Sequence, residues 1–143
     1  MLFRSRVIND AAMQALGSYT GGRMLFLGLG TGLGSALIVD GRLEPMELGH
    51  LPYKKGRSYE DYVGTSGLKR SGKKKWRRHV ANVIELLRFA LQADIVVVGG
   101  GNAKFLRELP KGVLRGSNEN AFVGGIRLWT EKTAPARRRA VAV

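Results

Sequence analysis

The chain has 143 residues, a length that suits one domain with a real hydrophobic core, and 44% of its residues are hydrophobic. Its apolar stretches are far shorter than a membrane-spanning helix, and the lack of cysteine excludes disulfides and thiolate metal sites. The formal net charge of +13 favours polyanionic partners such as nucleic acid, polyphosphate or an acidic membrane surface.

The first third of the chain predicts a helix followed by a hairpin. Asn9 or Asp10 can cap a helix that runs through Leu16 and ends at Gly17. Apolar runs at residues 24–27 and 36–39 predict two strands on either side of a glycine-dense turn. The Asp40-Gly41 pair that follows is typical of a tight hairpin turn, so the second strand ends there.

The remainder of the chain predicts further helices and one buried strand. Residues 43–72 favour a long loop with one helical piece at 59–63, and the apolar positions of residues 73–91 repeat with the period of one helix face. The β-branched run at 95–98 does not alternate, which predicts a strand covered on both faces. A short helix to Leu109, a last helix from Asn118 or Asn120 to Trp129, and a disordered basic tail complete the prediction.

The glycine-dense turn at residues 28–34 is the strongest candidate for a ligand site. Glycine adopts positive φ readily and allows the backbone to approach a ligand, so we expect both at this turn. Consecutive N–H groups in such a turn form a concave nest that suits phosphate oxygens, and Thr31 adds a hydroxyl. An ordinary tight β-turn without a ligand is the alternative.

Four short blocks carry a resemblance when they are taken together and in order. They are VINDAA at residues 7–12, LGTGLG at 29–34, ELGH at 47–50 and VGGG at 98–101. In this order they resemble the repressor/ORF/kinase (ROK) family of sugar kinases, and within it the polyphosphate-glucokinase-like members, over about residues 7–129. This resemblance implies an α/β fold: the C-terminal lobe of an actin-like ATPase, with a mixed sheet and packed helices.

The resemblance also implies a reaction and roles for individual residues. The reaction is phosphoryl transfer from ATP or polyphosphate, with Mg²⁺, to a hydroxyl of a glucose-like hexose. The matched positions are Asp10 as the catalytic base that also faces the sugar, Asn9, Glu47 and His50 as sugar ligands, Gly30, Thr31 and Gly32 as a phosphate loop, and Gly99, Gly100 and Gly101 as a turn near the nucleotide or distal phosphates. The chemistry is consistent, because phosphoryl transfer needs positioning, charge stabilisation and a proton acceptor.

Each matched residue also has a simpler interpretation. Asp10 could only cap a helix, Glu47 could be a solvated loop acid, and His50 could be a structural histidine that bonds a loop carbonyl. In many family members a cysteine-rich zinc site follows the histidine block. This chain has no cysteine and two histidines, so we expect neither zinc nor another metal held by the protein.

A second departure from the family concerns the start of the chain. The family begins with a lobe that carries an Asp-x-Gly-Gly-Thr phosphate loop, and here only nine residues precede Asp10. We therefore expect a truncated kinase that transfers phosphate poorly or not at all by itself. The expected organisation is residues 1–6 outside the resemblance, the lobe at 7–129, and the basic tail at 130–143.

The basic residues form a dense run that predicts polyanion binding. Its centre is Lys73, Lys74, Lys75, Arg77 and Arg78, and a solvated basic face is the alternative. Two functions compete with the kinase: a non-catalytic polyanion-binding module, and a sugar-sensing regulator, because the family also contains repressors. We expect a cytoplasmic protein whose partners are the hexose and the phosphate donor, without membrane or nucleic acid; a homodimer is left open.

Overall fold

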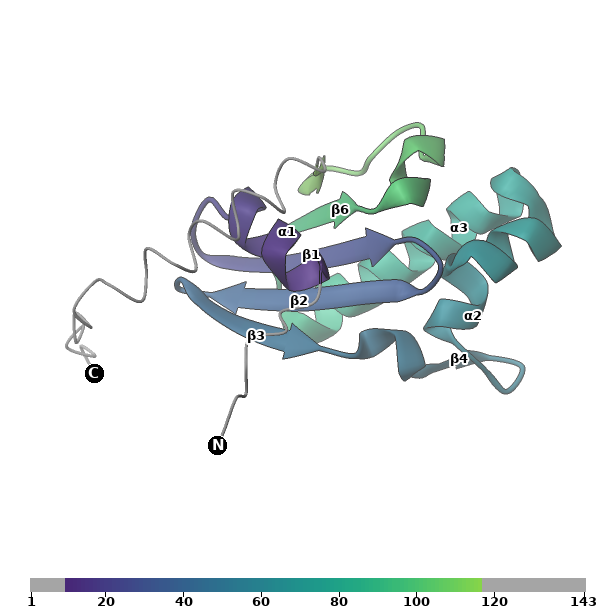
Figure 1. Cartoon of the computed structure of the whole chain (residues 1–143), viewed down its shortest axis with the longest axis horizontal. Helices are drawn as coiled ribbons and strands as arrows, with labels where there is room; N and C mark the ends of the chain where they lie inside the picture. Colours follow the sequence, from purple (N-terminus) through teal and green to yellow (C-terminus); the bar gives the residue numbers. More distant parts are fainter. Residues whose placement is uncertain (1–9, 117–143) are drawn as a thin grey trace.

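The computed structural model describes residues 10–116, which form a mixed five-stranded sheet with helices on both faces (Figure 1). Predicted segments at 1–9, 118–129 and 130–143 lie outside the described residues. The elements in chain order are α1 (Asp10–Ser18), β1 (Arg23–Leu29), β2 (Leu33–Val39), β3 (Arg42–Met46), the 3-10 helix η1 (Leu48–His50), β4 (Pro52–Lys54), β5 (Arg57–Ser58), α2 (Tyr59–Val63), α3 (Thr65–Leu91), β6 (Ile95–Gly99), the 3-10 helix η2 (Gly101–Phe105) and β7 (Val113–Arg115).

The sheet has the strand order β3-β2-β1-β6-β7. The β1–β2 and β2–β3 pairs are antiparallel, whereas β1–β6 and β6–β7 are parallel, so the predicted mixed α/β sheet is confirmed. The parallel β1–β6 pair brings the end of β1, at Gly28, beside the end of β6, at Gly99. Two glycine-rich segments that lie about 70 positions apart in the sequence therefore meet at one edge of the sheet.

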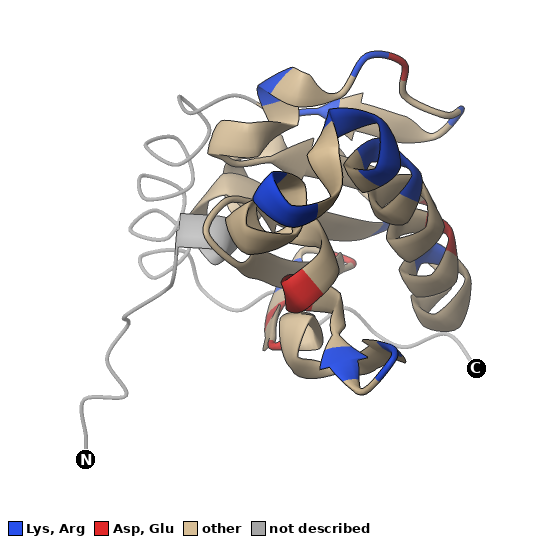
Figure 2. Ribbon diagram, turned by 90° about the vertical axis from the view of Figure 1, so that its right-hand side faces the viewer, with Lys and Arg blue, Asp and Glu red and all other residues tan. Residues whose placement is uncertain are grey.

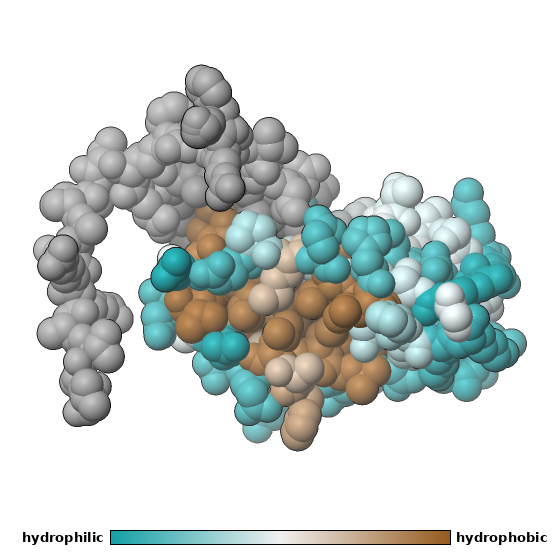
Figure 3. All heavy atoms as spheres, turned by 90° about the horizontal axis from the view of Figure 1, so that it is seen from below, coloured by the Kyte–Doolittle hydropathy of each residue, from teal (hydrophilic) through white to brown (hydrophobic). Residues whose placement is uncertain are grey.

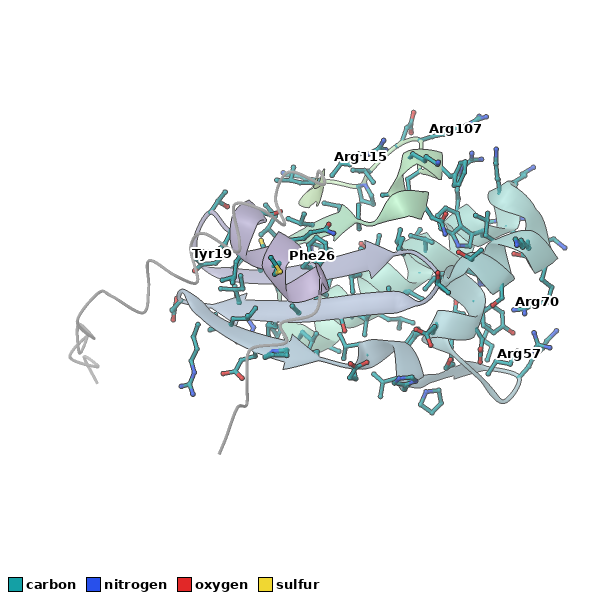
Figure 4. The ribbon with its side chains drawn as sticks, in the orientation of Figure 1. Tyr19, Phe26, Arg57, Arg70, Arg107 and Arg115 are labelled. Carbon is teal, nitrogen blue, oxygen red and sulfur yellow. The ribbon has the colours of Figure 1, made fainter. Side chains whose placement is uncertain are left out.

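Strands β1 and β6 are buried on both faces, as the non-alternating run at 95–98 predicted. Val96 and Val98 pack into the larger cluster with α3, while Val97 packs into a second cluster with α1. Phe26 of β1 belongs to the second cluster and lies beside α1 (Figure 4). Successive strand residues point to opposite faces, so continuous apolar runs are needed when both faces carry a helix.

One turn and three helices follow the sequence closely. Asp40 and Gly41 have φ values of 50° and 83°, the paired positive φ of a tight hairpin turn. The helical piece predicted at 59–63 is α2, and α1 extends the predicted first helix to Ser18. The predicted apolar face of α3 is buried as well, at Trp76, Val80, Val83, Ile84 and Leu87.

The loop predicted at 43–72 is wrong over most of its length. It contains β3, the β4–β5 hairpin and the first part of α3, which begins at Thr65 rather than Lys73. Strand β3 is an edge strand with mainly exposed residues and a proline at position 45, so it lacks the apolar alternation of a half-buried strand. Gly72, at φ 81° and ψ 163°, interrupts α3. The apolar period of residues 73–91 therefore does not continue into residues 65–71, and the sequence did not predict this first segment as a helix.

The segment after residues 99–101 was also predicted incorrectly. The expected short helix to Leu109 is a 3-10 helix that ends at Phe105, and the chain continues to the short strand β7. Three residues of β7 carry too little pattern to predict. Within residues 10–116, no helix combines the length and the apolar character that crossing a membrane requires.

Trp76 anchors α3 to α2 and offers a test of this packing. Its side chain is fully buried, and its Nε1–H donates a 2.9 Å hydrogen bond to the carbonyl of Val63, at the end of α2. Trp76→Phe removes the donor and leaves that carbonyl buried without its partner, so we expect a loss of about 1–3 kcal/mol in the free energy of unfolding. Urea denaturation measures it, and Phe89→Leu at an exposed position is the control. Equal stability of the two variants would contradict this role of Trp76.

Candidate functional site

The glycine turn joins β1 to β2 and is held from several sides. The Gly30 N–H donates to the Gly32 carbonyl at 3.1 Å, and the N–H of Thr65 donates to the carbonyls of Gly30 and Thr31 at 3.0 and 3.2 Å. The side chain of Asn102 adds bonds to the Gly30 carbonyl, at 3.3 Å, and to Thr65 Oγ1, at 3.1 Å. The start of α3 and η2 therefore fix the backbone of this turn.

The expected positive φ at this turn is wrong, because none of the glycines between residues 28 and 34 has one. Space is the constraint instead. A Cβ at Gly32 would collide with the side chain of Glu60, whereas a Cβ at Gly30 would meet no atom within 4 Å. Gly30 thus keeps open a space that the protein itself does not fill.

Two amide donors at the tip of the turn remain available. Among the described residues, the N–H groups of Thr31 and Gly32 have no hydrogen-bond acceptor. The next N–H, that of Leu33, donates to Glu60 Oε1 at 3.0 Å. Adjacent free amides in a turn form a nest that suits an oxyanion.

The second glycine segment, residues 99–101, lies directly against the end of β1. Gly100 has φ 86°, and a Cβ there would meet the backbone of Leu29, so only glycine fits. A Cβ at Gly99, which is buried, would lie 2.7 Å from Gln14 Oε1 and 2.8 Å from the Phe26 ring. Gly101 faces open space. The parallel β1–β6 pairing is what places this segment beside the glycine turn.

These segments enclose an open pocket of about 450 Å³. Gly30 and Gly101 both line it, and a Cβ at either position would meet no atom within 4 Å. Five of the residues named from the sequence line it together, namely Gly30, Gly32, Glu47, Gly100 and Gly101. The other lining residues are Gln14, Phe26, Gly28, Leu33, Gly34 and Glu60.

The predicted acid and histidine lie next to each other at η1. Glu47 lines the pocket, and its Oε2 is 3.7 Å from His50 Nε2. Both side chains are largely exposed, at 77% and 72%. His50 does not line the pocket. Of the two predicted sugar ligands at η1, the fold therefore brings only Glu47 to the glycine turn, and His50 lies next to Glu47.

Glu60 is the pocket residue that sequence analysis missed. It lies on α2, whose start is set by a capping box: Ser58 Oγ accepts from the Asp61 N–H, and Asp61 Oδ2 accepts from the Ser58 N–H at 2.8 Å. The hydrogen bonds from Ser58 lower the pKa of Asp61. The Ser-x-x-Asp spacing is a helix-start signal. It predicts α2, yet nothing in the sequence says that α2 packs against the glycine turn.

Asp10 is the first residue of α1, one turn before Gln14, which lines the pocket. Asn9 lies outside the described residues. Gln14 Oε1 is buried and accepts no hydrogen bond from any described residue. Helix α1 therefore contributes Gln14 to the pocket lining, and the role of Asp10 as a base stays a prediction.

The basic run is distributed over two sides of α3 and does not line this pocket. Lys73 lies over the Phe105 ring, with Nζ 4.7 Å from its centroid, and Arg77 Nε donates to the Phe105 carbonyl. Lys75 and Arg78 lie on the side that faces β4, and Lys74 is exposed. Figure 3 shows hydrophilic residues at the end of the molecule where Figure 1 places α2, β4 and the start of α3.

No group of three or more metal-ligating His, Cys, Asp or Glu side chains occurs within residues 10–116. The pocket brings two carboxylates together, those of Glu47 and Glu60. Mg²⁺ commonly binds one or two carboxylates together with substrate phosphates, so a cation that arrives with a phosphate donor is compatible with this lining.

Sequence comparisons give partial-length relatives, and no family model matches the chain. A polyphosphate glucokinase of Mycobacterium tuberculosis is 31% identical over 105 residues, which are 66% of this chain and 39% of the relative. The polyphosphate glucokinase of Mycobacterium leprae is 35% identical over 101 residues, 64% of this chain and 31% of the relative. The chain spans less than two fifths of the length of these curated relatives.

Solved structures share the fold over more of the chain. An inorganic polyphosphate/ATP-glucomannokinase from Arthrobacter sp. strain KM has a TM-score of 0.73 and 30% identity, covering 88% of this chain and 57% of that one. A ROK-family glucokinase from Streptomyces griseus, solved with glucose and AMPPNP, has a TM-score of 0.68 and 16% identity, covering 84% of this chain and 66% of that one. Because the sequence identity to the Streptomyces griseus enzyme is 16%, this second similarity supports the fold alone.

Proposed function

We propose that this chain, which is similar to polyphosphate glucokinases and shares the fold of part of the ROK-family sugar kinases, provides the sugar- and phosphate-binding lobe of a hexose kinase. The observation that carries the proposal is the pocket at the sheet edge. There, a glycine turn with two free amides adjoins two carboxylates and Gln14 of α1. An oxyanion site beside proton acceptors is what phosphoryl transfer to a hydroxyl needs.

The donor phosphate is assigned to the glycine turn. The N–H groups of Thr31 and Gly32 can donate to its oxygens. Gly30 and Gly101 leave room for the donor because neither has a Cβ. This arrangement holds a phosphate group without a cationic side chain in the pocket lining, so either polyphosphate or ATP is a suitable donor class.

The hexose is assigned to the side of the pocket lined by Glu47 and Glu60. Sugar hydroxyls donate and accept hydrogen bonds, and carboxylates accept them. Glu60 Oε1 already holds the Leu33 N–H, which fixes the carboxylate and leaves Oε2 for a hydroxyl. The buried Gln14 Oε1, which has no described donor, can accept from another hydroxyl.

In the proposed reaction, the Asp10 carboxylate accepts the proton of one hexose hydroxyl as that oxygen attacks the terminal phosphorus of the donor. A new O–P bond forms, the P–O bond to the rest of the donor breaks, and the shortened donor leaves with the electron pair. Amides of the glycine turn stabilise the charge on the transferred group. Mg²⁺ enters with the donor as part of the substrate and neutralises its phosphates.

A chimera tests the proposal, because the chain covers part of its relatives' length. Residues 10–116 would replace the matching segment of the Arthrobacter glucomannokinase, and transfer from polyphosphate or ATP to glucose would be measured. We expect glucose phosphorylation with at least one donor. A folded chimera that binds glucose and transfers to it from neither donor would contradict the assignment.

Two matched variants locate the sugar in this pocket. Glu60→Gln removes a charged acceptor that lines the pocket, so we expect glucose affinity to fall about tenfold, in line with a lost charged hydrogen bond. Glu44→Gln makes the same change on β3, where the carboxylate pairs with Arg42 outside the pocket. If the two variants bind glucose with equal affinity, the assignment of the hexose to Glu60 is wrong.

A further inference from the structure

A second pocket, of about 290 Å³, lies between β4 and the middle of α3. Its lining residues are Lys54, Lys75, Arg78, His79 and Asn82. The four α3 members follow at spacings of three, one and three residues, so they share one helix face. Figure 2 shows blue segments along α3 and on the β4–β5 hairpin at this end of the molecule.

The positive charge of this pocket is not neutralised within the described residues. No Asp or Glu lines it. The ion pairs between described residues are Arg42–Glu44 and His50–Glu47, and neither includes a lining residue. Instead of an acidic partner, Lys54 contacts an aromatic ring: its Nζ lies 5.1 Å from the ring centroid of Tyr53. A concave site with three full positive charges and no counter-charge attracts a multivalent anion.

His79 is the partly buried centre of the pocket. Its ring lies edge-on to Tyr62, with centroids 4.8 Å apart, and its Nδ1 is 3.3 Å from Tyr53 Oη. Burial, and then the charges of Lys54, Arg78, Arg70 and Lys75, lower its pKa. The neutral ring can accept the Tyr53 O–H at Nδ1, which leaves the Nε2–H as a donor.

We propose that this pocket binds phosphate groups of an inorganic polyphosphate chain, at a place separate from the glycine turn. The choice of polyphosphate rests on the proposed function, whereas the anion site itself rests on the lining residues. Lys75 and Arg78 supply charge, and Asn82 supplies amide donors that suit bridging and terminal oxygens.

The position relative to the first pocket supports a chain-like ligand. Helix α2 lies between the two sites, because Glu60 lines the first pocket and Tyr62 contacts His79. Helix α3 begins at the glycine turn, and Lys75 follows ten positions after Thr65. A long polyphosphate is charged along its whole length and can occupy both sites, which a single phosphate cannot do.

Nucleic acid fits this surface less well. Single-stranded nucleic acids need aromatic faces on which bases stack. Here the rings are engaged with one another: Tyr53 stacks on Tyr59 with centroids 5.2 Å apart, and Tyr62 meets Tyr53 edge-on at 4.9 Å. Arg70, at the same end of the molecule in Figure 4, lies over the Tyr62 ring at 5.6 Å.

Histidine side-chain NMR on the 143-residue chain tests the site directly. The two histidines, His79 and His50, report on the second pocket and on η1, which lies beside the first pocket. Tripolyphosphate should shift the His79 resonances and raise its pKa by roughly half a unit or more, because a bound anion offsets the neighbouring cations. By linkage, binding tightens as pH falls through that pKa. Sulfate, whose own charge is constant over this range, should raise the His79 pKa in the same direction.

The charged groups around His79 must be considered together in this titration. They lie on three elements: Tyr53 and Lys54 on β4, Tyr62 on α2, and Arg70, Lys75 and Arg78 on α3. Histidine is the side-chain type whose charge ordinarily changes between pH 5 and 8, so this titration follows His79.

Charge-matched variants separate a pocket from a diffuse basic surface. Lys75→Gln and Arg78→Gln should each weaken tripolyphosphate binding about three- to tenfold. Lys111→Gln removes the same charge from an exposed position outside the pocket and should change it less than about twofold. Equal weakening by all three variants would overturn the proposal, as would inorganic phosphate binding as tightly as tripolyphosphate.

The same NMR samples distinguish failure of this site from failure of the proposed function. If tripolyphosphate shifts the amide signals of Thr31 and Gly32 but not His79, the second site is wrong and the glycine-turn assignment stands. If His79 shifts while those amides do not, the second site stands and the donor site is wrong.

Discussion

Replacing Asp10 with asparagine is expected to lower kcat of the chimera by about two to four orders of magnitude, with little change in KM for glucose. An amide has nearly the shape of the carboxylate and can still hydrogen-bond a hydroxyl. It cannot accept the proton that the attacking oxygen must lose. The loss should therefore appear in the chemical step rather than in sugar binding, and steady-state kinetics over a range of glucose concentrations separates the two.

Asp40→Asn is the matched control for this experiment. Asp40 lies in the β2–β3 turn with φ 50°, a conformation that asparagine tolerates as well as aspartate does. The same chemical change there should leave kcat and thermal stability nearly unaffected. If Asp10→Asn retains the parental kcat but loses stability, Asp10 is a helix cap at the start of α1 and not the catalytic base.

Gly30→Ala is expected to weaken donor binding about tenfold without destabilising the fold, whereas Gly32→Ala should impair both. The new methyl group at Gly30 would meet no protein atom and would project into the pocket. Because its φ is not positive, alanine is tolerated, and the smaller freedom of the unfolded chain even adds about 0.4–1 kcal/mol of stability. At Gly32 the methyl group would displace Glu60 and break its bond to the Leu33 N–H, at a cost of about 1–3 kcal/mol.

Thermal melts, and NMR titrations with tripolyphosphate followed at the amides of Thr31 and residue 32, measure both effects on the 143-residue chain. We expect the two variants to differ. Gly30→Ala should have a normal melting temperature and weak donor binding, whereas Gly32→Ala should have a lowered melting temperature. If a well-folded Gly30→Ala variant binds the donor with unchanged affinity, the assignment of the donor phosphate to this turn is wrong. A stable Gly32→Ala variant would show that Glu60 can move away at little cost.

Several elements could be predicted because their signals are local. Residues 24–39 combine two apolar runs with a glycine turn, and the Asp40-Gly41 pair has the chemistry that two successive positive φ values require. The 3.6-residue period of apolar positions predicts the buried helix face at Trp76, Val80 and Val83. Edge strand β3 and the three-residue β7 carry no such pattern, since their pairing comes from neighbouring strands.

By itself, the sequence determined the candidate blocks at residues 9–10, 30–32, 47–50 and 99–101, the order of the main elements, and the concentration of positive charge in one region. The tertiary structure decided which of these blocks meet. The parallel β1–β6 pairing joins the two glycine segments, and the packing of α2 adds Glu60, a residue with no distinguishing local pattern. Helix geometry and the β4 contact divide the basic run between two sides of α3 and create the His79 pocket. The physical reason is that backbone conformation depends on neighbouring residues, whereas a binding site depends on contacts between residues tens of positions apart.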